Sequence, residues 1–362
     1  MTGAILSSMG DYGTLSRLIA DSRTVHDRLD LLTAQIGSGK IGTTYAALGG
    51  GAATSLDLTP AIGQLATWQK NIDAAATRIE VAQTALTRLQ EITKEFVART
   101  FSENGLDAAT IDNVAVNAKD ALSEVANLLD TQEGGLYVFA GQDTANPPIP
   151  NPNAIGGSPF FTQIQAAVQQ LATLGASGTA ASTLATAASN APTTSPFSTY
   201  LSQPVAALQA PVVQVGDGQM VVIGLFASGN STVASTGGST TGSYARDLMR
   251  ALATLGSLSS TQANDPNLAG LIDDTRQSLN GALTAMAGEA GVLGGRQAAL
   301  ETTKAQLAAT AIALTTQVSN AEDVDVADAM AKLSVVQTQL QASYQLIARA
   351  GDLSLVKFLP SP

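Results

Sequence analysis

The sequence predicts a mainly α-helical protein. Its N- and C-terminal helices pair as a coiled-coil layer, a long helical bundle adjoins them, and a small β-containing domain is inserted. Three observations support this fold class. Apolar residues recur at alternating steps of three and four near both chain ends, charged residues nearly vanish from the middle, and only 4% of the residues are aromatic although 45% are hydrophobic. Such a composition favours slim, closely packed helices.

The first apolar seam lies near the N-terminus. Its positions are Leu15, Leu18, Ser22, Val25, Leu29, Leu32 and Ile36. A helix with this heptad spacing wraps around a partner helix. The glycines at 37 and 39 predict where the helix ends.

A seam of the same period lies near the C-terminus, at Met330, Leu333, Gln337, Leu340, Tyr344, Ile347 and Gly351. Because the two seams agree in length and period, the simplest inference is that the chain ends pair with each other. The alternative is that each packs into an ordinary helix bundle. The apolar members of both seams form the predicted assembly interface: Leu15, Leu18, Val25, Leu29, Leu32, Ile36, Met330, Leu333, Leu340, Tyr344 and Ile347.

Further helices are expected between the seams. One begins at about Pro60, a residue favoured in the first turn of helices, and runs to about Phe96. The others are expected at 108–133, 244–255, 267–287 and 291–318, with an acidic break near Asn320 before the last helix.

The middle of the chain differs in character. Between Asp143 and Arg246 the only charged residue is Asp217. Strands are expected at 134–141, 211–215 and 219–226, the last two joined by a Gly-Asp-Gly hairpin, with a helix near 161–174. A disordered linker is the alternative. Apolar clusters favour a small folded unit with flexible stretches near 177–195 and 232–243.

These patterns predict three domains. Residues 1–39 and 325–362 form a terminal helical coiled-coil domain. Residues 40–145 and 244–324 form a long helical bundle, and residues 146–243 form a charge-poor inserted domain.

Composition excludes several function classes. The net charge of −11 disfavours binding to phosphate backbones, so no nucleic-acid partner is expected. The chain has no cysteine and one histidine, His26, which leaves no thiolate or histidine cluster for a metal. No segment reaches the ~20 apolar residues of a membrane helix. The N-terminus also lacks the features of a secretory signal peptide, so export would need another route.

No catalytic, cofactor-binding or metal-binding residue is predicted, and an enzyme is not expected. Residues 37–40, Gly-Ser-Gly-Lys, lack the earlier glycine and the following hydroxyl residue of a phosphate-binding loop. The acidic run at 322–325 lacks the alternating ligands and glycine turn of a calcium loop. A solvated helix start explains it better, because carboxylates are favoured there.

Three segments resemble bacterial flagellins and their hook-associated relatives. Residues 35–41, Gln-Ile-Gly-Ser-Gly-Lys-Ile, resemble the Leu-Ser-Ser-Gly-Lys turn that follows the first flagellin helix. Residues 322–325, Glu-Asp-Val-Asp, resemble the acidic turn before the final helix. Residues 291–296, Gly-Val-Leu-Gly-Gly-Arg, resemble the Gly–Arg corner that opens the preceding helix. The likeness covers roughly residues 1–145 and 245–362.

Two finer features resemble the hook–filament junction proteins, the third hook-associated proteins of this family. They are Gly-Leu-Tyr-Val-Phe-Ala-Gly at 135–141 and the ending Leu-Ser-Leu-Val-Lys-Phe-Leu at 353–359. The sequence departs from the family pattern after Lys40, where residues 43–48 replace an Asp-Asp-Pro loop.

The resemblance implies a structural axial protein of the bacterial flagellum that joins hook to filament by self-assembly. Its implied partners are itself, hook-associated protein 1, flagellin and an export chaperone. Its implied location is extracellular, after export by the flagellar type III pathway without a cleaved signal peptide. The alternatives are a flagellin, which would be a filament subunit, and, from a different class, a secreted helical adhesin whose middle unit binds a surface or a sugar.

Overall fold

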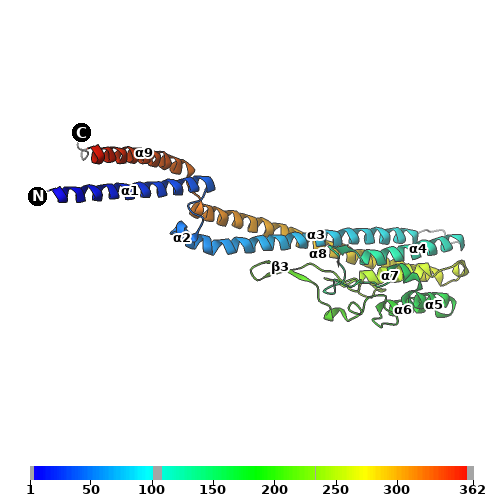
Figure 1. Ribbon diagram of the computed structural model, residues 1–362. Coiled ribbons are helices and arrows are strands. Elements are labelled where there is room, and N and C mark those ends of the chain that lie inside the picture. The colour runs from blue at the N-terminus through cyan, green and yellow to red at the C-terminus, as the bar shows by residue number, and fades with distance from the viewer. Residues whose placement is uncertain (1–3, 101–107, 233, 357–362) are drawn as a thin grey trace. The chain divides into compact units, whose positions relative to one another are not determined.

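The computed structural model describes residues 4–100, 108–232 and 234–356, and the side chains of the described residues between 16 and 349. The described chain is mainly α-helical with two small sheets, which confirms the predicted fold class (Figure 1). It divides into two compact units, one drawn from residues 1–65 and 309–362 and the other from residues 66–308. The predicted division into three domains remains a prediction.

The terminal unit is built on two long helices, α1 (Ala4–Ser38) and α9 (Val326–Val356). They run antiparallel and side by side, so the first residues of α1 and the last residues of α9 lie at the same end of the pair (Figure 1). The short helix α2 (Tyr45–Leu48), the start of α3 (Gly51–Thr100) and the end of α8 (Leu268–Glu322) complete the unit. Of the two arrangements left open by the sequence, the structure therefore contains the pairing of the chain ends.

The second unit is a helical bundle with a smaller layer packed against it. Helices α4 (Ala108–Leu129) and α7 (Tyr244–Gly256) pack together beside the longer α3 and α8. Helices α5 (Pro159–Gln169) and α6 (Leu171–Ala188) pack against each other and against α7. Short 3-10 turns lie at Pro152–Gly157, Val205–Ala207 and Ser260–Gln262.

Both sheets of the second unit are two-stranded and antiparallel. Strand β1 (Gln132–Glu133) pairs with β2 (Leu136–Tyr137), and β3 (Val212–Gly216) pairs with β4 (Gln219–Val222). The predicted hairpin is confirmed, with Gly218 in the left-handed conformation that its turn requires. The strand expected at 134–141 is wrong in extent, because the backbone after β2 pairs instead with residues 225–227 through the bridge Ala140–Phe226.

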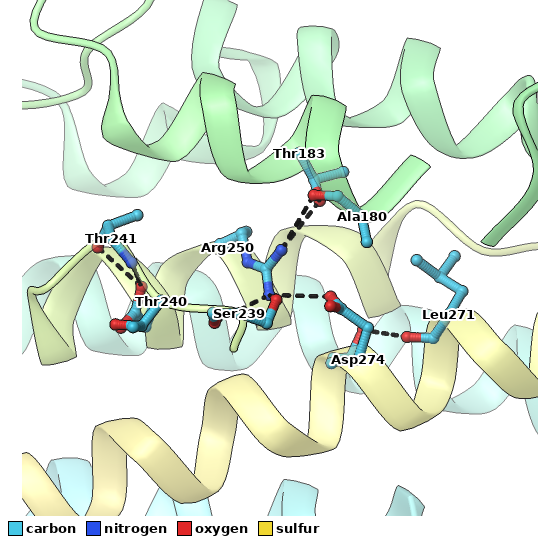
Figure 2. A network of polar contacts seen from close by, with 10 residues as sticks. Ala180, Thr183, Ser239, Thr240, Thr241, Arg250, Leu271 and Asp274 are labelled. Carbon is cyan, nitrogen blue, oxygen red and sulfur yellow. Dashed lines mark hydrogen bonds and ion pairs between the residues drawn. The ribbon is translucent and has the colours of Figure 1, made fainter. Parts of the chain in front are cut away.

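Every residue of helix α7 is buried. Its N-terminus is capped by the Ser243 side chain, which accepts a hydrogen bond from the backbone N–H of Arg246. Such a helix must satisfy its polar groups internally. The terminal nitrogens of Arg250 donate hydrogen bonds to Ser239 and Thr183 and form an ion pair with Asp274 (Figure 2), whereas Arg250 Nε has no hydrogen-bond partner among the described residues. These contacts connect α6, α7, α8 and the loop before α7.

Helix α3 begins earlier than the sequence predicts. It starts at Gly51 and runs through Pro60, which the sequence placed at the helix start. Glycine is required at this first position, because a Cβ atom there would lie 2.5 Å from the backbone oxygen of Ala321 in α8. Proline removes one backbone hydrogen bond from a helix interior, and this 50-residue helix tolerates that loss.

Helix α8 is continuous where two helices and a Gly–Arg corner were expected. It passes through the glycines at 288, 291, 294 and 295. Each glycine costs a helix up to about 1 kcal/mol relative to alanine. Burial of Met286, Leu293 and Leu300 in the core on both sides of these glycines offsets that cost. The helix ends at Glu322, two residues beyond the expected break.

The charge-poor tract is folded, as the apolar clusters indicated. Helices α5 and α6 replace the single helix expected near 161–174, and Gly175 interrupts α6 with a left-handed conformation. Helix α6 continues to Ala188, so the flexible stretch expected at 177–195 is wrong over most of its length. Residues 240 and 241 donate hydrogen bonds to the Asp247 carboxylate, which holds part of the second expected stretch in place.

Helix α4 ends at Leu129, before the expected 133, because β1 begins at Gln132.

Asp130, directly after α4, predicts a pH dependence of stability. Its carboxylate accepts a hydrogen bond from the backbone N–H of Ile149 at 2.8 Å. Burial nevertheless raises the pKa of Asp130 from 3.8 to about 6, so the folded state holds this proton more tightly than the unfolded state. The free energy of unfolding should therefore fall by about 1 kcal/mol as the pH rises from about 4 to 6, and this group should contribute no slope outside that window.

Urea titrations at several pH values between about 4 and 7 test this expectation. Asp130→Asn keeps an oxygen that accepts from Ile149 but cannot titrate, so it should remove this part of the slope. An identical slope in the variant and the wild type would contradict the assignment.

Candidate assembly interface

The face of α1 that meets α9 is the predicted N-terminal seam. Leu32 is buried, and Leu18, Val25, Leu29 and Ile36 are half-buried. Val25, Leu29 and Ile36 pack against the cluster of buried residues that contains Leu32. The side chain of Leu15, the first predicted member, lies outside the described residues.

The face of α9 that meets α1 has a different register from the one expected. Its most buried members are Ala329 and Val336, and Leu333 packs against them. Leu340 and Ile347 are half-buried on the same stripe. The seam therefore follows positions 329, 333, 336, 340, 343 and 347. The sequence prediction shares three of these positions and missed Ala329 and Val336.

Two predicted members of the α9 seam lie off this stripe. Met330 and Tyr344 are 54% and 53% exposed within the chain. Both expected and observed registers step by three and four, and α9 carries apolar residues on more than one stripe, so spacing alone did not identify the side facing α1. Whether Met330 and Tyr344 contact another chain stays a prediction.

The α1–α9 pair leaves a second set of apolar residues uncovered. Its described members are Ile19 and Leu31 on α1 and Val326, Met330, Val335, Tyr344 and Leu346 on α9, each more than a third exposed. We call these seven residues the outer apolar set. Large apolar side chains gathered on one helix pair indicate an interaction surface.

The two motifs beside the paired helices meet in space. Residues 39–41, which follow α1, pair antiparallel with residues 322–324, which precede α9. The backbone N–H of Ile41 donates to the carbonyl of Glu322 at 2.7 Å, and that of Val324 donates to the carbonyl of Gly39 at 3.0 Å. The sequence identified both motifs but gave no signal that they form one junction.

Side chains reinforce this junction. The Lys40 ammonium lies 2.5 Å from the Glu322 carboxylate and 3.7 Å from that of Asp323. The Ser55 hydroxyl, from α3, donates a short hydrogen bond to Glu322. The hydrogen bond from Lys40 holds the pKa of Glu322 below its usual range. The junction thus connects the starts of α3 and α9 with the ends of α1 and α8.

The acidic run also starts the last helix. The Asp325 carboxylate accepts hydrogen bonds from the backbone N–H groups of Ala327 at 2.9 Å and Asp328 at 3.1 Å. This is the geometry of an N-cap, which satisfies donors that have no partner inside the helix. The prediction of a helix start at this acidic run is confirmed.

The described part of the chain also bears on metal binding and on membrane insertion. No group of three or more histidine, aspartate or glutamate side chains there is arranged to hold a metal ion. Within the same residues, no helix has the length and apolar character needed to cross a membrane. His26 lies on the exposed side of α1, 3.8 Å from Asp30 on the next turn.

The last two helices decide the relationship to known proteins. Residues 277–359, which hold most of α8 and the whole of α9, match the bacterial flagellin C-terminal helical region. This part of the chain is similar to the C-terminal helical region of flagellins. The resemblance expected from residues 291–296 and 322–325 is thereby confirmed, although the first of these motifs forms no corner here.

A solved structure extends the likeness in fold. It is that of a protein from Vibrio parahaemolyticus assigned as a flagellar hook-associated protein. The alignment has a TM-score of 0.51 at 12% sequence identity and covers 74% of this chain and 96% of that chain. At this identity the likeness concerns the fold. No curated protein sequence matches the chain.

Proposed function

We propose that this chain is a structural axial protein of the bacterial flagellum that joins the hook to the filament by self-assembly after export. The observation that carries the proposal is the pairing of α1 with α9, the last helix of the segment that matches the flagellin C-terminal helical region. One stripe of the pair is covered inside the chain, and the outer apolar set is not. A neighbouring subunit would remove that surface from water, at roughly 25 cal/mol for each Å² buried.

The proposal assigns partners and location. Copies of this chain, hook-associated protein 1 and flagellin would cover the outer apolar set in the assembled axis. An export chaperone would cover it beforehand, since an uncovered apolar surface promotes aggregation. Assembly would take place outside the cell after passage through the flagellar type III pathway, without a cleaved signal peptide.

The choice of a junction protein over a filament flagellin rests on the sequence of residues 135–141 and 353–359. In the structure, Val138, Phe139 and Ala140 are buried beside residues 225–227. These contacts account for the apolar character of the segment. They would be the same in a junction protein and in a filament flagellin, so they do not distinguish the two roles. A genetic experiment separates the two roles.

Deleting the gene is expected to leave hooks without filaments while flagellin is secreted into the medium as unpolymerised subunits. A junction protein supplies the surface on which flagellin polymerises, so its loss blocks assembly but not export. Loss of a sole flagellin would instead leave bare hooks and no flagellin in the medium. Immunoblots of the culture supernatant and electron microscopy of hooks provide the measurement, and unchanged filament length would contradict the junction role.

A further inference from the structure

The β3–β4 hairpin of the second unit (Figure 1) has one outer edge without a partner in the described chain. The backbone N–H of Ile223 donates to the carbonyl of Pro211 at 3.0 Å, so these two residues form a hydrogen-bonded pair. Hydrogen-bonded and non-hydrogen-bonded pairs alternate along an antiparallel ladder. The backbone groups of Met220 and Val222 therefore point away from β3, and they have no hydrogen bond among the described residues.

The opposite edge of the hairpin is covered. It lies against α3, where the Asn71 side chain donates to the backbone carbonyl of Gln214 at 2.9 Å. Strand β4 reads Gln-Met-Val-Val, without a charged residue or a proline, and the irregularity of the ladder lies at 214–216 in β3. A regular, uncharged edge of this kind accepts a strand from another chain. Because β4 has only four residues, such a contact would be small and transient.

The outward face of the hairpin is apolar. Val212, Met220 and Val222 are 51%, 61% and 36% exposed, and Val212 lies opposite Val222 in the register. Val213 and Val221, which alternate with them, pack against the core of the unit. A strand added beside β4 would therefore find free backbone groups and could extend an exposed apolar face across the new boundary.

We propose that β4 pairs antiparallel with β4 of a second copy of this chain, across a two-fold axis that passes beside Val221. In this register Met220 of each copy lies opposite Val222 of the other. The outward N–H and C=O groups of β4 then all meet, and each facing pair exchanges both of its hydrogen bonds. The side chains of the same pairs pack together on the outward face.

Charge favours a second copy as the occupant of this edge. The chain has a net charge of −11, so two copies repel each other where their acidic surfaces approach. Asp217 is the only charged residue between Asp143 and Arg246, so the hairpins can approach with little repulsion. In the proposed register the two Asp217 carboxylates lie at opposite ends of the joined sheet, roughly 25 Å apart at a rise of about 3.4 Å per residue, a distance at which salt screens them.

This pairing is separate from the proposed axial role. A two-fold contact uses the same surface on both copies and closes on itself, whereas a continuing array is built from contacts between different surfaces. The outer apolar set belongs to the terminal unit, and the hairpin belongs to the second unit. The inference therefore does not rest on the proposed function.

Single cysteines in the otherwise cysteine-free full chain test the register. Val221→Cys places two thiols opposite each other at a non-hydrogen-bonded pair, where the Cβ atoms are close enough for a disulfide. Mild oxidation and non-reducing gel electrophoresis should show a covalent dimer forming at least about tenfold faster than for Asp217→Cys, because disulfide formation depends on the access of one thiol to the other. Asp217 is exposed, so its cysteine reports random collisions. Equal rates, or no dimer from Val221→Cys, would overturn the proposed register.

Two proline variants of the otherwise unaltered chain test the edge itself. Val222→Pro removes an N–H that points away from β3, so the hairpin keeps its own ladder but loses a hydrogen bond to the other copy. Sedimentation equilibrium should show self-association weakened by about tenfold or more. Val212→Pro is the matched control, because it removes the equivalent N–H from the edge beside α3, and it should leave self-association unchanged. Equal effects of the two prolines, or no effect of Val222→Pro, would contradict pairing through β4.

Discussion

Replacing Val336 with aspartate is expected to separate α1 from α9 and to stop incorporation into the flagellum while export continues. Val336 is 3% exposed and lies with Leu32 and Ala329 in the only buried cluster of the terminal unit among the described residues. Burying an unpaired carboxylate in that position costs several kcal/mol, so the separated helices become lower in free energy than the paired ones. Leu340→Asp, at a half-buried position on the same stripe, should act in the same direction with a smaller loss.

Circular dichroism of the purified chain measures the separation. The helical signal should fall by up to the 35 residues of α1 and the 31 of α9, because a long amphipathic helix without its partner is marginal in water. Immunoblots of sheared flagella and of the culture medium measure incorporation and export. Full helicity together with normal incorporation would contradict a packed role for this stripe.

Val335→Asp is the matched control, one residue along the same helix. Val335 is 56% exposed and belongs to the outer apolar set. This variant should keep its full helical signal. If the outer apolar set packs against neighbouring subunits, as proposed, Val335→Asp should still reduce incorporation. The pair of variants therefore distinguishes packing inside the chain from packing between chains.

The seams show how far the sequence could predict this region. On α1 the positions given by heptad spacing, including Val25, Leu29 and Leu32, face α9, and their role in assembly stays a prediction. On α9 the same spacing fits two stripes, and the choice between them depends on small residues such as Ala329, which carry little weight in a pattern of large apolar side chains. The junction between residues 39–41 and 322–324 could not be predicted from the sequence. It is formed by backbone hydrogen bonds, which do not depend on side-chain type.

The glycines and Pro60 led to helix boundaries that the structure does not have. Their local preferences predicted helix boundaries at Pro60 and near Gly288, yet α3 and α8 pass through both. In helices of 50 and 55 residues, packing along the bundle outweighs a local cost of a few kcal/mol. The inserted tract shows a related effect. Its low charge suggested looseness, whereas its order depends on arginines of α7 that lie outside the tract in sequence.

Replacing Arg250 with methionine is expected to lower the free energy of unfolding of the second unit by about 3 kcal/mol. Arg250 is 1% exposed and donates to Ser239 Oγ at 2.6 Å, Asp274 Oδ2 at 3.0 Å and the backbone carbonyl of Ala180 at 3.2 Å (Figure 2). Methionine fills a similar length without donors. It therefore leaves these acceptors buried or half-buried with a partner missing.

Urea unfolding followed by tryptophan fluorescence measures this loss, because Trp68, the single tryptophan of the chain, belongs to the second unit. Arg88→Met is the control. Arg88 forms two ion pairs, with Glu124 at 2.7 Å and Glu91 at 3.1 Å, but its side chain is 45% exposed. Its loss should change the free energy of unfolding far less than the loss of Arg250, because water screens exposed ion pairs. A larger loss for Arg88→Met than for Arg250→Met would show that burial does not determine the strength of these contacts.

Combining Arg250→Met with Asp274→Asn separates the ion pair from the other hydrogen bonds of Arg250. If the pair contributes substantially, the double variant should lose less stability than the two single variants together, by about 1 kcal/mol or more. Strict additivity would assign the effect to Ser239, Thr183 and Ala180 instead. In that case Arg250 would stabilise the unit chiefly by connecting α6 and the loop before α7 to the bundle, and the contact with α8 would be secondary.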